Sequence, residues 1–373
     1  MKKCLCIAVF LIFAGTSHSF GEPFNRIGQG IRNQGMGNVG IALSHDENAL
    51  QYNPAGLIGV DNFFVSLGLL GEVSDDAINL TSELQELSDS STADTLEIAL
   101  GKKLRLRFLI NANILIPADG FVFGISALGE VQFGFAFENP VLPEISFYTQ
   151  ADQVQTYGLA FPIGRGGLVI GVAMRMVQRL SLYPPVEISL DNLITAGSDT
   201  GDLTDQYSGA GTIANGQGYD IGIHWRVEGD WSMTIGAVAQ NLGSMTFAGA
   251  AYPKAVPTEY SVGFSFQPGN DYFRLLYAFD LRDLTMEGTS DRDLTKRIHT
   301  GIEFGILPID SGTSFLAFRS GYNQGYFSYG FEINPFVFAR FITIQVAAYG
   351  EETGETAGSG KEARRSFQLS FAF

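Results

Sequence analysis

The sequence predicts an all-β fold: a transmembrane antiparallel β-barrel of about 14 strands, with an N-terminal plug and short helices in an external loop. Three observations predict it, namely an N-terminal secretory signal, long runs of alternating apolar and polar residues, and connections that are alternately long and short. The composition agrees, because 30 Phe, 14 Tyr and 45 Gly among 373 residues suit many aromatic-rich strands. We therefore expect the mature chain in a bacterial outer membrane.

The N-terminus has the three parts of a secretory signal peptide. Residues 1–3 carry two lysines, residues 4–14 are apolar, and small residues follow through Ser19. The domain division that follows from this signal is a signal peptide over residues 1–21, a plug segment over residues 22–60 and the barrel over residues 61–373.

Composition excludes several classes of protein and site. Both cysteines, Cys4 and Cys6, lie in the predicted signal, so the mature chain has no thiol for a disulfide, a metal ion or nucleophilic catalysis. Beyond the signal there is no apolar stretch of about 18 residues, which excludes a helical inner-membrane protein. The formal net charge of −16 argues against nucleic acid as a partner, because phosphate binding needs a basic face.

Residues 104–116 show the alternation that predicts a strand with one apolar face. Every even position in this run is apolar, and the odd positions include Arg105 and Arg107. Residues 121–137 alternate in the same way, with Phe121 to Phe137 on one face and no change of phase within the run, and we interpret them as one long strand with no hairpin at Gly129. Bulky residues on one parity and polar residues on the other predict a barrel with a lipid-facing exterior and a wet lumen.

The same alternation recurs along the rest of the chain. It is found around residues 157–161, 168–174, 219–225, 260–266, 273–279, 298–304 and 327–331. The length of each run is close to the roughly 9 to 11 residues that a tilted membrane strand needs. A soluble β-sandwich would have shorter strands of about 5 to 6 residues.

The connections between these strands support the same architecture. The predicted long links are 73–103, 139–151, 183–214, 244–256, 284–294 and 350–362, and the short ones lie around Ala118, Arg165, Gly229, Gly269, Asp310 and Pro335. Only the short link near Gln324 breaks the alternation. Short periplasmic turns and long external loops then give about 14 strands and place both termini in the periplasm.

The C-terminus ends on alternating aromatic residues, with Phe371 and Phe373 as the last two. This ending resembles the insertion signal that the barrel assembly machinery reads in outer-membrane proteins. The alternative is a strand that ends on an aromatic residue for packing alone. We expect the assembly machinery to be a partner during insertion, and outer-membrane lipids to surround the folded barrel.

The segment before the first strand has a composition of its own. Its distinctive residues are Gly35, Gly37, Gly40, Asn53, Pro54 and Ala55. Ser44 with Glu47 three residues later predicts a short helix that Pro54 ends. A nucleotide-binding role for the glycines would need an α/β unit that the sequence lacks. We expect a compact plug whose glycines allow tight backbone packing inside the barrel.

This segment, the terminal Phe and the strand count resemble the FadL-like family of outer-membrane transporters for long-chain fatty acids and other hydrophobic compounds. The matching residues are the turn at Gly35 to Gly37, the stretch from Asp46 to Leu50, and Asn53 to Ala55. TraF-like barrels and PorV-like barrels, which assist protein secretion, have similar N-terminal segments. The resemblance implies passive uptake of a hydrophobic solute past a movable hatch; it assigns no ligand-contact residues.

Two groups of side chains are candidates for contact with a solute. Arg105 and Arg107 on the lumen side could hold a carboxylate head group by charge-assisted hydrogen bonds, or could pair with lumen acids. In the first external loop, apolar residues from Ile78 to Leu87 recur at spacings of three and four, which predicts a helix with one apolar face. That helix would form a surface site for an apolar ligand or a cap on the barrel rim.

Other chemistries have little support in the sequence, so we expect no enzyme, no cofactor and no metal. His45, His224 and His299 have no serine motif to partner them, and the acidic residues Asp199 and Asp202 lie in a loop without calcium-binding spacing. Two hypotheses remain. The first is a plugged channel for hydrophobic solutes, and the second is a structural or secretion-accessory barrel that binds other proteins.

Overall fold

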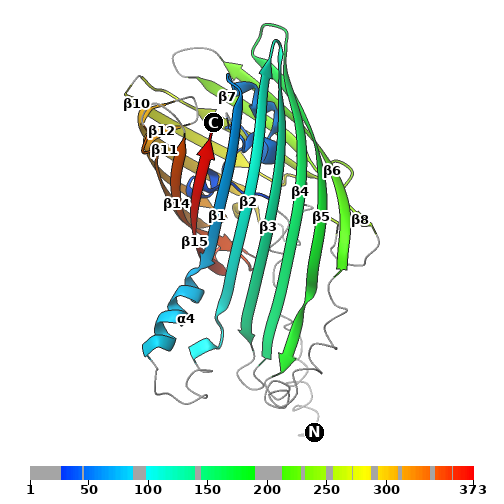
Figure 1. The fold of residues 1–373 in the computed structure, drawn as a ribbon, viewed down its shortest axis with the longest axis vertical. Helices are drawn as coiled ribbons and strands as arrows, with labels where there is room; N and C mark the ends of the chain where they lie inside the picture. The colour runs from blue at the N-terminus through cyan, green and yellow to red at the C-terminus, as the bar shows by residue number, and fades with distance from the viewer. Residues whose placement is uncertain are drawn as a thin grey trace, which may run out of the picture.

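The protein forms one closed antiparallel sheet, seen here in a computed structural model (Figure 1). The structure describes residues 27–43, 46–86, 98–138, 144–189, 212–227, 232–248, 255–270, 272–286, 293–309, 313–336, 341–354 and 356–373. The predicted signal peptide, His45, Asp199 and Asp202 lie outside the described residues.

Fourteen strands of the described chain follow one another around the barrel, each antiparallel to its neighbours. They are β1 (Phe64–Ser74), β2 (Lys103–Ala118), β3 (Phe121–Glu138), β4 (Glu144–Ile163), β5 (Leu168–Ser189), β6 (Thr212–Val227), β7 (Met233–Gln240), β9 (Glu259–Phe266), β10 (Phe273–Leu281), β11 (Ile298–Pro308), β12 (Ser314–Asn323), β13 (Tyr326–Ile333), β14 (Ile342–Glu352) and β15 (Lys361–Ala372). The barrel closes where β1 pairs with β15. A two-residue strand, β8 (Phe247–Ala248), pairs with β6 beside this ring.

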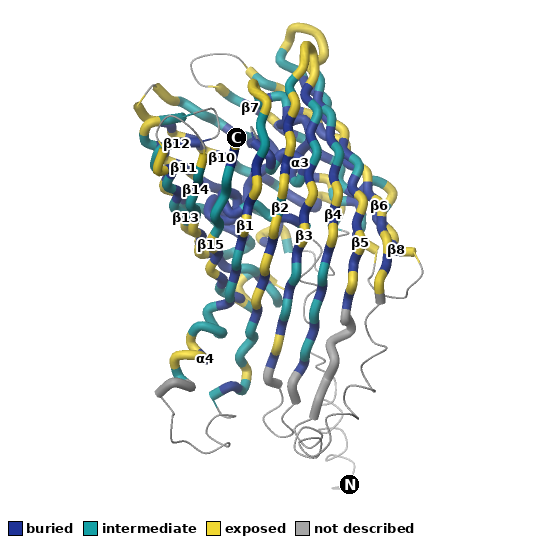
Figure 2. The backbone as a smooth tube through the Cα atoms, viewed as in Figure 1, coloured by how far each residue is buried: buried dark blue, intermediate teal, exposed yellow. Residues whose placement is uncertain are grey.

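The alternation in the sequence decides which side chains face the lipid. In Figure 2, buried and exposed residues alternate along β2. Phe108 and Ile110 are each 55 % exposed on the outer face, whereas Arg105 and Arg107 are buried on the inner face. Closure gives every strand two neighbours, so the backbone polar groups bond within the ladder and the apolar face can meet hydrocarbon. The predicted outer-membrane barrel is confirmed.

The two ends of the barrel differ. Tight turns after β2 and after β4 lie at the same end as the C-terminus (Figure 1). Gly120 and Gly164 adopt positive φ in these turns, a conformation open to glycine without strain. Strands β4 and β5 are 20 and 22 residues long and extend far toward the opposite end, whereas β7 and β9 have only eight residues each. The barrel wall is therefore taller along β2 to β5.

Two predicted loops are shorter than expected. The link after β3 covers residues 139–143 instead of 139–151, and the link after β5 covers 190–211 instead of 183–214. The ladder between β3 and β4 continues to the pair Glu138 and Glu144. Backbone pairing persists there beyond the apolar alternation, so a pattern based on side chains ends the strands too early.

The helices lie inside the barrel and at its ends. Inside the barrel, α2 (Ile31–Gly35), α3 (Ala49–Tyr52) and the 3-10 helix η1 (Pro54–Gly59) belong to the N-terminal segment, which we define as residues 27–43 and 46–60. Helix α4 (Asp75–Glu86) follows β1, and the 3-10 helix η2 (Leu294–Arg297) precedes β11. No helix in the described part of the chain has the length and apolar character needed to cross a membrane.

Helix α4 is the predicted external helix, and its partners show where it sits. Arg365 of β15 pairs with Asp75 at a distance of 2.8 Å from Nε to Oδ1, and Lys103 donates its backbone N–H to Asp76. Leu80 is buried. Helix α4 therefore packs on the outer rim at β1, β2 and β15. Its role as a cap or as a surface site for an apolar ligand stays a prediction, and Leu87 lies outside the described residues.

The C-terminal aromatic gives a first test of assembly. We expect Phe373→Ala to lower the amount of folded barrel in the outer membrane severalfold, because the terminal aromatic is the residue that the assembly machinery would read. Phe367→Ala on the same strand and the same outer face is the control, since both rings are at least half exposed. Heat-modifiable migration of membrane fractions measures folded barrel, and an equal loss in both variants would contradict a sorting role for Phe373.

Candidate functional site

The N-terminal segment lies against the inner wall at glycine positions. A Cβ added to Gly301 of β11 would sit 2.1 Å from the carbonyl oxygen of Met36, and one added to Gly171 of β5 would sit 2.1 Å from the backbone nitrogen of Ala55. Gly236 and Gly321 meet the backbone of the segment in the same way, whereas Gly222 meets the side chain of Asn53. At Gly171, Gly236, Gly301 and Gly321 the backbone of the segment therefore rests directly on the strands.

The predicted glycines of the segment are part of the same contact. Gly37 has φ of +70°, and a Cβ there would lie 2.3 Å from the carbonyl oxygen of Thr300. A Cβ on Gly35 would lie 2.9 Å from the Cα of Gly330, and one on Gly40 would lie 2.2 Å from Cδ1 of Tyr52. Close approach of backbones, which the sequence suggested, explains Gly35 and Gly37, and packing against the Tyr52 ring explains Gly40.

Asn53, Pro54 and Ala55 sit together where β5, β6 and β7 meet the segment. The buried Asn53 amide donates to the carbonyl oxygens of Ile41 and Ala237, at 2.9 and 3.2 Å, and accepts from the backbone N–H of Ala55 at 3.1 Å. Pro54 begins η1, where a missing N–H costs nothing. The Asn53 side chain thus links the backbone at Ile41 and at Ala55 to strand β7 of the wall.

Polar wall residues satisfy the backbone of residues 37–41. Asp280 accepts the N–H groups of Gly40 and Ile41 at 2.7 and 3.0 Å. His224 donates to the Ile41 carbonyl at 2.8 Å, and His299 donates to the Gly37 carbonyl at 3.0 Å. Both histidines therefore hold the segment in place.

A buried ion-pair cluster holds α2. Arg32 makes a two-pronged contact with Glu303 of β11, with both N–O distances 2.9 Å, and pairs with Asp46 at 3.1 Å. Glu303 also binds Arg274 at 2.7 Å and Arg319 at 2.6 Å. Burial opposes the charge on Arg32, but Glu303 and Asp46 outweigh it and raise the pKa of the guanidinium, so Arg32 stays charged.

The two arginines proposed as ligand contacts face the lumen but already have partners. Arg107 pairs with Glu130 at 2.9 Å and with Glu72 at 3.4 Å. Arg105 pairs with Glu362 at 3.0 Å and donates to the hydroxyl of Tyr148. A carboxylate ligand would have to compete with these acids. The arginines therefore pair with lumen acids, which is the second of the two possibilities that the sequence left open.

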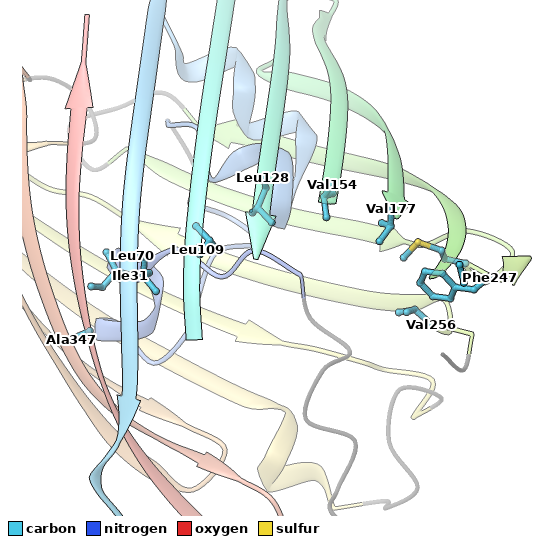
Figure 3. Packing of buried hydrophobic residues seen from close by; sticks show 11 residues of the cluster. Ile31, Leu70, Leu109, Leu128, Val154, Val177, Phe247, Val256 and Ala347 are labelled. Carbon is cyan, nitrogen blue, oxygen red and sulfur yellow. The ribbon is translucent and has the colours of Figure 1, made fainter. Parts of the chain in front are cut away.

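An apolar band crosses the inner wall at one level, and the sequence did not suggest it. Figure 3 shows its side chains pointing inward from β1 to β8. Its members are Leu70, Leu109, Leu128, Val154, Val177, Ala214, Met245, Phe247, Val256 and Ala347, and Ile27 and Ile31 of the N-terminal segment pack against them. We call this set the apolar band. The sequence contained a sign of this band, because leucines and valines stand at lumen-facing positions that are otherwise polar.

Ion pairs border the apolar band on both sides. Toward the end predicted to be external, Arg179 pairs with Asp152 at 2.7 Å, next to the pairing of Arg107 with Glu130. Toward the end predicted to be periplasmic, Arg175 pairs with Asp220 at 3.1 Å. Each arginine faces a carboxylate, so the walls next to the band are polar without an excess of either charge. The described residues contain no group of side chains arranged to hold a metal ion.

Comparison with solved structures identifies the fold. The Ralstonia pickettii toluene transporter TbuX matches with a TM-score of 0.55 and 14 % identity, covering 94 % of this chain and 98 % of that one. The monoaromatic hydrocarbon channel CymD matches with a TM-score of 0.51 and 12 % identity, with the same coverage. No protein-family model and no curated protein sequence matches. The chain therefore shares the β-barrel fold of these two proteins.

The glycine contacts give a matched test of how the N-terminal segment is held. We expect Gly301→Ala to destabilise the protein by about 1 to 3 kcal/mol, because the new methyl group collides with the Met36 carbonyl. Gly129→Ala is the control, since a Cβ there meets open space on the outer face. Thermal unfolding and protease cleavage of the N-terminus measure the effect; equal behaviour of the two variants would contradict a direct backbone contact.

Proposed function

We propose that this protein is a passive outer-membrane channel for hydrophobic solutes, with the N-terminal segment as its plug. The apolar band carries the proposal. A lumen that only conducted water and ions would have no need of leucine and valine side chains at one level of five neighbouring strands. Similarity to a toluene transporter and a hydrocarbon channel supports the same class of solute.

The charges around the band favour an uncharged solute. A long-chain fatty acid would bring a carboxylate into a region where Arg107 and Arg179 already bind acids. Removing an arginine from its partner would leave that partner buried and unpaired, at a cost of several kcal/mol. We therefore rank neutral hydrocarbons first and long-chain fatty acids second as the solute.

The proposed route joins the apolar band to the plug. Ile27 and Ile31 complete the band, so a solute in the band touches the plug directly. Arg32, next to Ile31 in the chain, holds α2 on Glu303. We infer that passage requires α2 to leave the wall, and that the ion pair sets how often it does so. No covalent chemistry and no nucleotide are needed, because the solute moves down its gradient.

Binding of solute by the purified protein tests the proposed function. We expect labelled toluene to bind, and Val154→Asn to weaken binding about tenfold by placing an amide in the apolar band. Val262→Asn on the outer face of β9 is the control, and it should bind as the parent does. Parallel titration with a labelled long-chain fatty acid ranks the two solutes. If a folded barrel binds neither, the structural or secretion-accessory hypothesis is favoured.

Solute flux tests the gate. We expect Arg32→Gln to speed the entry of the solute into liposomes severalfold, because α2 loses its two-pronged contact with Glu303. Arg365→Gln, which removes the half-exposed ion pair with Asp75, is the control and should leave the flux unchanged. Unchanged flux through folded Arg32→Gln protein would show that this ion pair does not gate the channel, while leaving the solute-binding result intact.

A further inference from the structure

The outer wall contains a patch of hydrogen-bonding side chains on β4, β5, β6 and β8. We call it the amide patch and define it as Gln153, Gln155, Gln178, Asn215, Gln217 and Thr246. All six are exposed, and they lie on the parity that elsewhere faces lipid. They pair across the ladder, Gln153 with Gln178 and Gln178 with Asn215, so the patch is continuous.

Apolar side chains lie on both sides of the amide patch along the same strands. Toward the external end come Leu180 and Ile213, which are 40 % and 64 % exposed. Toward the periplasmic end come Tyr219 and Ile221, which are 49 % and 46 % exposed. The amides are therefore an island within the apolar wall. Hydrocarbon satisfies none of their donors or acceptors, so leaving them against lipid costs free energy.

The patch satisfies only a part of its own hydrogen-bonding capacity. Gln178 donates to Asn215 at 3.4 Å, and Gln217 donates to the hydroxyl of Tyr219 at 2.7 Å. Gln155 accepts from the hydroxyl of Tyr157 at 3.4 Å. Each primary amide offers two N–H donors and an acceptor oxygen, so most of the capacity points toward whatever covers the patch.

An apolar hollow adjoins the patch and shares Gln153 and Gln178 with it. Its floor is made by Gly129 and Ala151, and the space in front of Gly129 is open. Phe108 and Ile110 form one wall. The outer face thus combines a recess that can receive an apolar side chain with a row of amides that can be paired.

We propose that the amide patch and this hollow form the contact surface between two copies of this chain. Primary amides both donate and accept, so the patch is complementary to itself, as a two-fold interface requires. Two barrels inserted with the same orientation and related by an axis along the membrane normal hold their patches at the same depth.

The chemistry of the patch argues against a lipid as its cover. An acyl chain has no donor or acceptor to offer. A lipid phosphate is bound by Arg or Lys, and the outward-facing side chains that line the patch and the hollow carry no charge. The nearby acids Glu130 and Asp152 face the lumen and bind Arg107 and Arg179 there. A second copy supplies the missing partners without any charged group.

Crosslinking in native membranes tests the interface. Gln178→Cys is placed in a chain whose Cys4 and Cys6 are changed to Ser, and the membranes are treated with a short bismaleimide. We expect a species of twice the mass. Ile302→Cys on the opposite wall is the matched control, being 44 % exposed on β11, and it should remain monomeric.

A second measurement uses variants that lipid should tolerate. We expect Gln153→Leu with Gln178→Leu to weaken self-association at least tenfold in mild detergent, while heat-modifiable migration shows an intact barrel, because leucine suits a lipid-facing position. The proposal is overturned if the parent protein is monomeric in both detergent and nanodiscs, if a lipid copurifies on a monomer, or if Gln178→Cys crosslinks only to another protein.

Discussion

The structure depends on one constraint, which is that a non-helical backbone must lie inside a barrel without leaving its polar groups unsatisfied. Wall glycines such as Gly301 and Gly171 let the backbone of the N-terminal segment reach the strands. Asp280, His224 and His299 then satisfy the N–H and C=O groups that approach them. The hydrogen bonds depend on the glycines, because a side chain at a wall glycine would move the backbone of the segment out of reach of Asp280, His224 and His299. Strand glycines that weaken a sheet elsewhere are here the surface on which the segment packs.

The lumen divides into regions of different chemistry around that contact. Buried arginines and carboxylates occur together, and Glu303 alone meets three arginines. Such clusters cost desolvation, and their value is to fix geometry more than to add stability. The apolar band lies on the taller wall, flanked by charges that are already neutralised. In the proposed channel, this arrangement would favour neutral hydrophobic solutes over ions.

Sequence reasoning reached the fold because barrel alternation is a local property. The run from Leu104 to Ile116 identifies β2 and its lipid-facing side without any knowledge of the partners. The pairing of Arg32 with Glu303 joins residues 271 positions apart, so no spacing in the sequence can indicate it. The apolar band escaped for another reason. Each strand has only one or two apolar residues among its lumen-facing positions. These residues form a band only because strand pairing places them at the same level of the barrel.

The distribution of contacts along the plug decides which part of it can move. Residues 37–55 are held by Asp280, by the two histidines and by Asn53, on several strands at once. Helix α2 is held mainly by Arg32, with Gln34 bonded to Glu72 and Tyr349 at 3.3 and 3.2 Å. Local opening follows the least-held element first. In the proposed channel, a passage beside the apolar band would therefore open when α2 leaves its place while the rest of the plug stays on the glycine wall.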